Sequence, residues 1–272
     1  MSEATRAAPS SPSSGWPGLS LLRRCEFVLA LAAVGVLWHV ASAVAHNKTL
    51  VPPPLAVLRA WMGLWREDLP TDILASLTHL GIGYGFGVAA GLLLALLAAR
   101  FAIFEAIIEP FIEMLRPISA IAWIPIAILM FGIGRAVPVF LIFYAASFPV
   151  FINTLAGIKG VDPRLVQAAE MLGASRRMIV THVVMPAAVP LILAGARLSL
   201  GVAWMAMVAA ELTGADSGLG WRIFWYQEFF AMDKVLAVIL TIGLLGYGFD
   251  TLLRKLQRGV TRWQPDPAGP DR

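Results

Sequence analysis

The chain has 272 residues, of which 58% are hydrophobic and only 14% are charged, with a mean hydropathy of +0.76. Soluble domains carry about 25% charged residues, so this composition excludes a globule whose whole surface faces water and indicates a lipid environment. The net charge of +4 comes from basic residues in short segments between apolar stretches, which is typical of a membrane protein rather than a nucleic-acid-binding one. The single cysteine, Cys25, excludes an intramolecular disulfide framework and any site built from several cysteines.

The order of polar and apolar segments along the sequence predicts one membrane domain between two short tails. The N-terminal residues are rich in Ser, Pro and Gly, and we expect residues 1–24 to form a disordered cytoplasmic tail. Residues 25–258 are expected to form the transmembrane domain, and residues 259–272 a second cytoplasmic tail. The domain contains apolar segments near the roughly 20 residues that a helix needs to cross about 30 Å of hydrocarbon. The segments lie at 26–45, 73–99, 107–131, 137–157, 189–212 and 235–253.

This pattern predicts an all-α membrane protein with about six transmembrane helices. The first apolar segment has a second interpretation, because Arg23, Arg24, an apolar run and Ala43-Val44-Ala45 imitate a secretory signal peptide with its cleavage site. The run is longer than a typical signal core and five apolar segments follow it, which favours a retained helix. With the N-terminus inside, fourteen Lys and Arg residues lie on the cytoplasmic side and six on the other. This bias predicts that both termini are cytoplasmic.

The second apolar segment carries a spacing of small residues that predicts close helix packing. Gly83, Gly87 and Gly91 recur every four residues, so they share one face on which another helix can approach closely. Packing within one chain is favoured over a contact between two copies. No long-period internal repeat is evident, which disfavours the secondary transporters that are built from inverted repeats.

The segment 158–188 has helical signals of its own between the fourth and fifth apolar segments. Asp162 is suited to be an N-cap, Pro163 to occupy the first helical position, and Gly173 to follow the helix in the left-handed conformation. Ser175 can cap a second short helix, and Pro186 marks the return towards the membrane. The first helix has one apolar face, formed by Leu165, Ala168, Ala169 and Leu172. That face suits a groove on a partner protein and the membrane surface equally well.

The same segment resembles the EAA loop of bacterial ABC-importer permeases. The loop pattern is Glu-Ala-Ala, three residues, Gly, nine residues, and then Ile-x-Leu-Pro. Here Gln167-Ala168-Ala169, Gly173 and Val183-x-Met185-Pro186 keep that spacing, and Gln167 replaces the family's Glu. The stretches 50–61, 115–134, 195–212 and 217–224 are similar to the nitrate, sulfonate and taurine branch of these permeases.

The resemblance implies a role, partners and site residues. The chain would be the non-catalytic permease subunit of an ATP-binding-cassette importer in a bacterial inner membrane, for a small nitrate-, sulfonate- or taurine-like anion. Its partners would be cytoplasmic ATPase subunits that bind ATP and Mg, a second permease copy in a homodimer, and a periplasmic solute-binding protein; the chain itself would bind no cofactor. The residues implied in ATPase coupling are Asp162, Pro163, Gln167, Ala168, Ala169, Gly173 and Pro186.

The sequence contains no motif for nucleotide binding or catalysis. There is no G-x-x-x-x-G-K-[S/T], GxSxG, HExxH or CxxC pattern, and the four His residues are scattered. We therefore predict no catalytic residue and no metal site, and we expect the energy for transport to come from a separate subunit. The rival function is a secondary, ion-coupled transporter, which should show paired broken helices or buried ion-carrying carboxylates. An ABC exporter subunit is disfavoured by the loop pattern and by the lack of a fused ATPase.

Polar and aromatic side chains within apolar segments are candidates for the substrate pathway because they are costly in lipid. Each candidate also has a structural interpretation: a hydrogen bond between helices, snorkelling towards the headgroups, or a position at the interface. The candidates are His79, Arg197, Trp204 and Glu211. Asp250 and Arg254, four residues apart, are predicted to form a local ion pair. Residues 221–230, after the fifth segment, contain an aromatic cluster. This cluster is interpreted first as an interfacial belt or re-entrant segment and second as a docking surface for the binding protein.

Overall fold

The computed structural model describes residues 18–45 and 50–260, and all regular secondary structure in these ranges is helical. The chain divides into two compact units, Met1–Ala56 and Val57–Arg272. The first unit contains α1 (Gly18–Val44), so residues 18–24 are helical where the sequence predicted a tail. Leu19, Leu21 and Leu22 favour a helix over disorder at this point. The rest of the two predicted tails, 1–17 and 261–272, lies outside the described residues.

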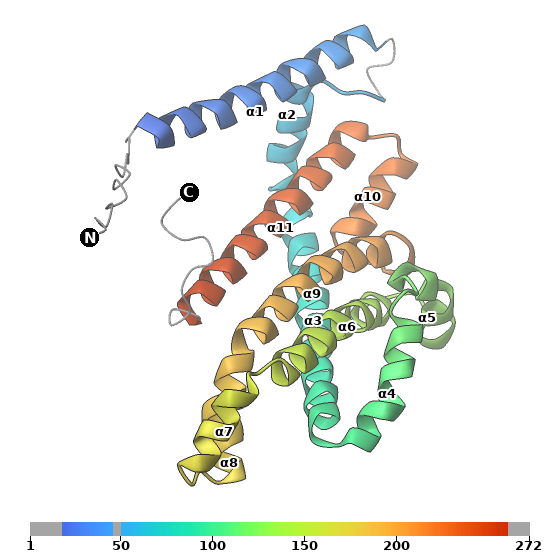
Figure 1. Ribbon diagram of the computed structural model, residues 1–272. Helices are drawn as coiled ribbons and strands as arrows, with labels where there is room; N and C mark the ends of the chain where they lie inside the picture. The colour runs from blue at the N-terminus through green and yellow to red at the C-terminus, as the bar shows by residue number, and fades with distance from the viewer. Residues whose placement is uncertain (1–17, 46–49, 261–272) are drawn as a thin grey trace, which may run out of the picture. The chain divides into compact units, whose positions relative to one another are not determined.

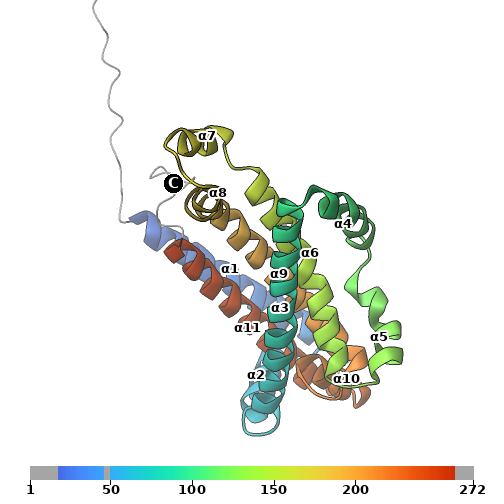
Figure 2. The same ribbon diagram turned by 90° about the horizontal axis from the view of Figure 1, so that it is seen from below.

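The second unit is a bundle of long helices with shorter helices at its ends. After α2 (Pro54–Leu64), which begins in the first unit, its elements are α3 (Leu69–Arg100), α4 (Ala102–Leu115), η1 (Ala120–Trp123), α5 (Ile124–Phe131), α6 (Ala136–Lys159), α7 (Pro163–Met171), α8 (Arg176–Ile179), η2 (Val180–Val184), α9 (Met185–Gly214), α10 (Leu219–Glu228) and α11 (Met232–Val260). Helices α7 and α8 lie at one end of the bundle and α10 at the other (Figures 1 and 2). We call these the α7 end and the α10 end.

Four helical stretches are long and apolar enough to cross a membrane: Leu69–Arg100, Ala136–Lys159, Arg176–Gly214 and Met232–Gln257. They contain the predicted second, fourth, fifth and sixth spans. A fifth crossing results if α4 and the η1–α5 segment count as one broken span. The apolar helical segment Ala32–Val44 of α1 is shorter than the roughly 20 residues of a full crossing. The all-helical membrane class is confirmed, whereas a count of six spans is not reached in the described part of the chain.

The predicted straight span over 107–131 is bent by 90° between Leu115 and Ala120. Pro117 explains the break, because it has no N–H to continue the helical hydrogen-bond ladder and its ring clashes with the preceding turn. Helical structure restarts at Ser119, whose side-chain oxygen accepts a hydrogen bond from the Ile121 amide. The apolar composition of the segment is continuous across this point, so hydropathy alone did not reveal the bend.

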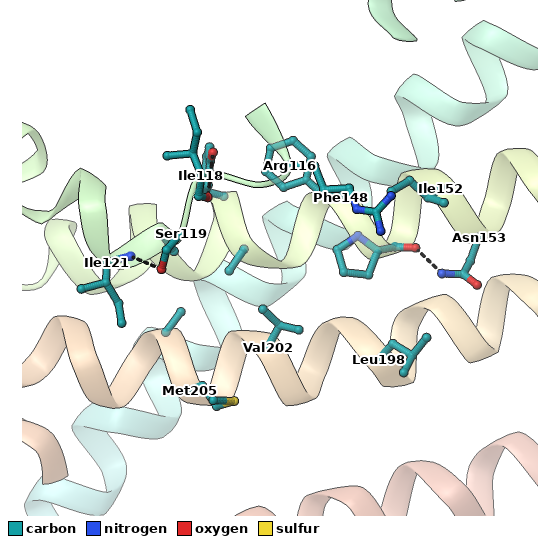
Figure 3. A pocket seen from close by; sticks show the side chains of 15 residues that line it. Arg116, Ile118, Ser119, Ile121, Phe148, Ile152, Asn153, Leu198, Val202 and Met205 are labelled. Carbon is teal, nitrogen blue, oxygen red and sulfur yellow. Dashed lines mark hydrogen bonds between the residues drawn. The ribbon is translucent and has the colours of Figure 1, made fainter. Parts of the chain in front are cut away.

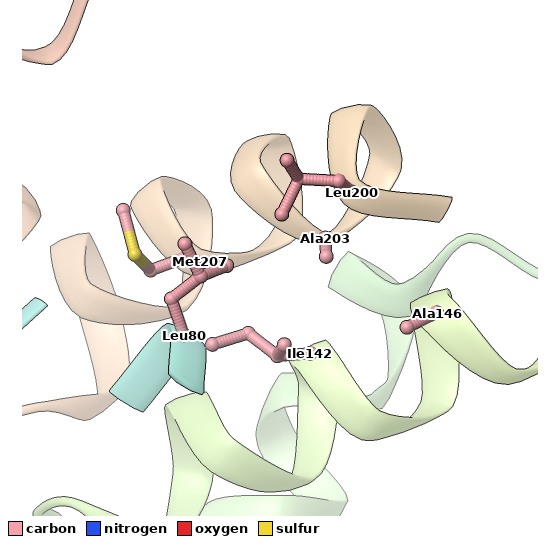
Figure 4. Close-up of a cluster of buried hydrophobic side chains, with 6 residues drawn as sticks. All are labelled: Leu80, Ile142, Ala146, Leu200, Ala203 and Met207. Atoms are coloured by element: carbon pink, nitrogen blue, oxygen red, sulfur yellow. The ribbon is translucent and has the colours of Figure 1, made fainter. Parts of the chain in front are cut away.

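The core of the second unit lies where α6 packs between α3 and α9. Leu80, Ile142, Ala146, Leu200, Ala203 and Met207 form a buried cluster there (Figure 4). The glycine face of α3 makes this packing close: a Cβ at Gly83, Gly87 or Gly91 would lie 2.7 Å from atoms of α6. These glycines therefore mediate contact within one chain, as the sequence predicted.

Replacing Gly87 with alanine should destabilise the chain by about 1–3 kcal/mol, because the new Cβ would lie 2.7 Å from Ala146 Cβ and 2.9 Å from the Phe143 carbonyl oxygen. Gly85→Ala is the matched control, since nothing lies within 4 Å of its Cβ position on the same helix. Thermal unfolding of both variants in detergent would measure the difference. Equal midpoints for the two variants would contradict this packing of α3 against α6.

Candidate functional site

The N-terminus of α7 is fixed by the two residues that the sequence pointed to. The Asp162 carboxylate accepts a hydrogen bond of 2.9 Å from the Arg164 amide, and Pro163 occupies the first helical position. This cap satisfies an amide that the first turn of a helix leaves without a partner, while Pro163 has none to satisfy. The short α7 helix therefore has a defined start although none of its residues is buried.

The C-terminus of α7 is closed by a Schellman motif around Gly173. Gly173 has a φ of +77°, a left-handed conformation that strongly favours glycine. Its amide donates to the Glu170 carbonyl over 2.9 Å, and the Ala174 amide donates to the Ala169 carbonyl over 3.0 Å. These are the two bonds that define the motif. They set the direction in which the chain leaves α7.

The outer side of α7 presents apolar side chains to its surroundings. Leu165, Met171 and Leu172 are 52%, 84% and 88% exposed, and Ala168 is exposed beside them. We call this surface, formed by Leu165, Ala168, Met171 and Leu172, the α7 face. Ala169, which the sequence placed on the same face, is instead half-buried, and Gln167 is exposed. Large apolar side chains this exposed on a short connecting helix need a cover, which a partner protein or the membrane surface can provide.

The second part of the loop differs from the prediction of a separate short helix. Ser175 does cap α8, since its hydroxyl accepts from the Met178 amide, but α8, η2 and α9 continue as one helical stretch from Arg176 to Gly214. One wide turn, in which the Met185 amide donates to the Val180 carbonyl, comes directly before Pro186. Because Pro186 lacks an N–H, a wide turn of this kind lets the helix continue past it. Pro186 is exposed at this junction.

At the α10 end, two of the predicted pathway residues meet in a buried polar cluster. His79 of α3 and Glu211 of α9 are 1% and 0% exposed, and His79 Nδ1 lies 2.8 Å from Glu211 Oε1. The other carboxylate oxygen accepts from the Ser76 hydroxyl over 2.8 Å and from the Gly220 amide over 3.0 Å. Glu211 thus joins α3, α9 and the first turn of α10, where a negative charge is favourable. His79 Nε2 is buried with no hydrogen-bond partner among the described residues.

A second polar contact also holds α10 against α3. Arg222 of α10 donates to Asp72, which is 4% exposed, and pairs with Asp68 over 3.0 Å. Burial acts to lower the pKa of Arg222, but the hydrogen bond and charge of Asp72 outweigh it and raise that pKa above its ordinary value. The outward side of α10 carries the aromatic cluster, in which Trp221 and Trp225 stack at 5.5 Å between ring centroids.

The other two predicted pathway residues lie elsewhere and apart from each other. Arg197 Nε donates to Asp250 over 2.8 Å, and Asp250 also accepts from Arg254 over 2.7 Å, so the predicted local pair is part of a three-residue link between α9 and α11. Trp204 packs against Phe249, with 5.7 Å between ring centroids, beside the buried cluster of Figure 4. A shared pathway through all four residues remains a prediction.

A cavity of about 540 Å³ lies midway along α6 and α9, against the bend between α4 and η1 (Figure 3). Its walls are mostly apolar, and its polar side chains are Arg116, Ser119, Tyr144 and Asn153. Sequence reasoning missed these residues as site candidates, although Pro117 next to Arg116 was a signal that the span is interrupted there. None of the four predicted pathway residues lines this cavity.

A bundle of apolar helices with an exposed helical connection at one end is the architecture of a polytopic membrane protein. The model of the family "Binding-protein-dependent transport system inner membrane component" matches residues 87–262. The chain belongs to this family, and the resemblance inferred from its sequence, a transmembrane permease of the ABC-importer type, is confirmed.

Curated relatives cover nearly the whole chain. It is 35% identical to the taurine transport system permease protein TauC of Escherichia coli K12, over 91% of this chain and 92% of that one. It is 32% identical to a putative aliphatic sulfonates transport permease protein, SsuC of Bacillus subtilis 168, over 96% of this chain and 93% of that one. The nitrate import permease protein NrtB of Synechococcus elongatus is 29% identical, over 86% of this chain and 89% of that one.

Solved structures share the fold at lower sequence identity. A chain of the MetNI methionine ABC transporter in an inward-facing conformation matches with a TM-score of 0.61 and 19% identity, over 70% of this chain and 95% of that one. A chain of an amino acid ABC transporter solved with histidines matches with a TM-score of 0.60 and 18% identity. The match covers 75% of this chain and 97% of that one. These matches show that the helical bundle shares its fold with chains of those two ABC transporters.

Proposed function

We propose that the chain forms part of the solute pathway of its importer and that α7 is the element through which a separate ATPase subunit drives it. The observation that carries this proposal is the α7 face, which is apolar and exposed on a helix that is capped at both ends. A preformed helix of this kind loses little conformational entropy when it docks in a groove. The exposed Gln167, in place of the family's Glu, would contribute a neutral contact to that docking.

The position of α7 explains how movement would reach the pathway. The helix connects α6 to the long stretch that contains α9, and these two helices pack closely along the core. A displacement of α7 when the ATPase subunits close would therefore tilt α6 and α9 together. ATP would supply the free energy by binding the two conformations with different affinity. The coupling residues would be Asp162, Pro163, Gln167, Ala168, Ala169, Gly173 and Pro186, as the loop resemblance implies.

The remaining features of the proposal concern partners, location and cargo. The α7 end would face the cytoplasm, both termini would be cytoplasmic, and the aromatic side of α10 would face a periplasmic solute-binding protein. A second copy of the chain, in a homodimer, would complete the pathway. The ATPase subunits would bind ATP and Mg. Residues 25–258 of this chain would form the membrane domain. The names of the relatives, for taurine, aliphatic sulfonates and nitrate, support a small cargo that carries an anionic group.

The test is to purify the full chain from membranes of its host with a C-terminal tag and to measure the co-purified ATPase subunit and its hydrolysis of ATP. Leu172→Asp and Ala168→Asp place a carboxylate on the α7 face without removing any packing inside the chain. An unpaired charge at a docked surface costs about 2–3 kcal/mol or more, so we expect partner binding to weaken by roughly 100-fold.

Glu170→Ala is the control, since Glu170 is exposed on the same helix but lies away from Ala168 around the helical circumference. It should retain the ATPase and its activity. If an ATPase subunit fails to co-purify with the unmodified chain, or remains bound and active in both aspartate variants, α7 is not the coupling element.

A further inference from the structure

Two arginines and one aspartate link α9 to α11, which pack against each other within the bundle (Figure 1). Arg197 of α9 donates to both carboxylate oxygens of Asp250 on α11, over 2.8 and 3.2 Å. Arg254, one turn further along α11, donates to one of the same oxygens over 2.7 Å. We call these three residues the α9–α11 link. It holds two guanidinium groups beside a single carboxylate.

The α9–α11 link carries an uncompensated positive charge. Two guanidinium groups face one carboxylate, so the net charge of the three ionised side chains is +1. Among the residues that the structure describes, neither arginine forms an ion pair with a second carboxylate. The link therefore attracts a further negative charge.

The link lies at the level where the hydrocarbon of a bilayer meets the headgroups. Residues 235–249 of α11 contain no charged side chain. Lys234 precedes this stretch and Arg254 follows it, and the two are about 30 Å apart along the helix at 1.5 Å per residue. That length matches the thickness of the hydrocarbon core. When Lys234 is at one boundary of the core, Arg254 is at the other, within reach of lipid phosphate groups.

Both arginines have more N–H groups than Asp250 uses. A guanidinium group carries about five N–H donors, and Asp250 accepts from two nitrogens of Arg197 and from one of Arg254. The side chains of Arg197 and Arg254 are 35% and 48% exposed, so an acceptor can reach them from outside the bundle. Two guanidinium groups held side by side can donate to the oxygens of one phosphate group.

An exposed apolar surface of α11 adjoins the link. Leu240, Tyr247 and Arg254 recur every seven residues, so they lie on one face of the helix. Leu240 and Tyr247 are 44% and 73% exposed. This face extends from the link along the apolar part of α11, where the acyl chain of a lipid bound at the link would lie.

We infer that Arg197 and Arg254, held together by Asp250, form a binding site for the phosphate group of an anionic phospholipid. The net charge of +1 matches a lipid with one negative charge, such as phosphatidylglycerol, better than a lipid whose headgroup is neutral overall. The occupant is a lipid rather than a free phosphate ester, because the apolar face of α11 also fits its acyl chains. The inference goes beyond the proposed function, since it involves neither the ATPase nor the transported solute.

Native mass spectrometry of the full chain, released from detergent micelles with added lipid, measures the affinity for the first bound lipid. We expect the unmodified chain to bind phosphatidylglycerol roughly fivefold more tightly than phosphatidylcholine, the effect of about one favourable charge contact near a membrane surface. Arg254→Gln and Arg197→Gln each leave the link without net charge, so each should abolish this preference. Lys255→Gln is the matched control, because it removes the same charge from the neighbouring exposed position of α11 and should keep the preference.

Three results would overturn the inference. The first is equal affinity of the unmodified chain for the two lipids. The second is an equal loss of preference in Arg254→Gln and Lys255→Gln, which is the result of diffuse attraction to a basic helix end. The third is displacement of phosphatidylglycerol by glycerol 3-phosphate, which would assign the site to a free phosphate ester. Thermal unfolding without added lipid shows whether each variant is folded, and because the two link variants lie on different helices, either of them decides the test alone.

Discussion

Replacing Glu211 with alanine should lower the free energy of unfolding of this chain by about 3–5 kcal/mol, because it removes one member of a buried pair and takes a hydrogen-bond partner from several buried polar groups. Glu211 is 0% exposed, and its carboxylate contacts His79, Ser76 and the Gly220 amide. Without it His79 Nδ1 and the Gly220 amide stay buried without this partner, and Ser76 keeps only the hydrogen bond that it accepts from the Leu219 amide. The first turn of α10 would also lose the side-chain oxygen that accepts from the Gly220 amide.

Thermal unfolding of the purified chain in detergent would measure this loss. Glu228→Ala is the matched control, because Glu228 is an exposed glutamate at the end of α10. Its midpoint should stay near that of the unmodified chain, since surface substitutions usually change stability by less than about 0.5 kcal/mol. Glu211→Ala unfolding at the same temperature as Glu228→Ala would show that the buried cluster does not hold α3, α9 and α10 together.

A double-mutant cycle tests whether His79 and Glu211 act as one unit. His79→Leu alone leaves the Glu211 carboxylate with one partner fewer, whereas the double variant His79→Leu with Glu211→Leu removes both polar groups. Replacing both members of a buried pair with apolar residues is less destabilising than breaking it from one side. We therefore expect the double variant to lose clearly less stability than the sum of the two single variants.

The parts of this protein that sequence could predict are those fixed by local signals. Asp162, Pro163 and Gly173 define α7 because capping and left-handed backbone depend on residues within a few positions. The spans at α3, α6, α9 and α11 follow from hydropathy in the same way. The glycine spacing of α3 also indicated its packing face correctly, because small residues on one face permit close approach whatever the partner helix is.

The parts that sequence could not predict depend on which helices become neighbours. In the sequence, His79 and Glu211 were two separate pathway candidates, 132 positions apart. Only the packing of α3 against α9 brings them into contact, beside the first turn of α10. Arg197 was read as an interior or snorkelling side chain, but Asp250 on α11 is its partner. Arg116 was one of the fourteen basic residues that the sequence assigned to the cytoplasmic side. The bend at Pro117 places it in a pocket between η1, α6 and α9.

Replacing Gly173 with valine should reduce ATP-driven transport by about tenfold while leaving the membrane bundle folded. A β-branched residue at a φ of +77° is strained by roughly 1–2 kcal/mol, which corresponds to about a tenfold change in an equilibrium. Nothing lies within 4 Å of the Cβ position, so the effect comes from the backbone alone. Relief of the strain breaks the bonds from the Gly173 and Ala174 amides and changes the direction in which α8 and α9 leave α7.

Gly173→Asn separates this effect from the mere loss of a glycine, because asparagine tolerates the left-handed conformation much better than valine does. Uptake into proteoliposomes of a labelled solute chosen from those named for the relatives, measured together with ATP hydrolysis, should be near normal for Gly173→Asn and low for Gly173→Val. Thermal unfolding should be similar for both, since Gly173 is exposed at the edge of the bundle. If both variants transport equally well, the angle set by the Schellman motif is not needed for coupling. If both fail equally, the requirement is for the small size of glycine rather than for its backbone conformation.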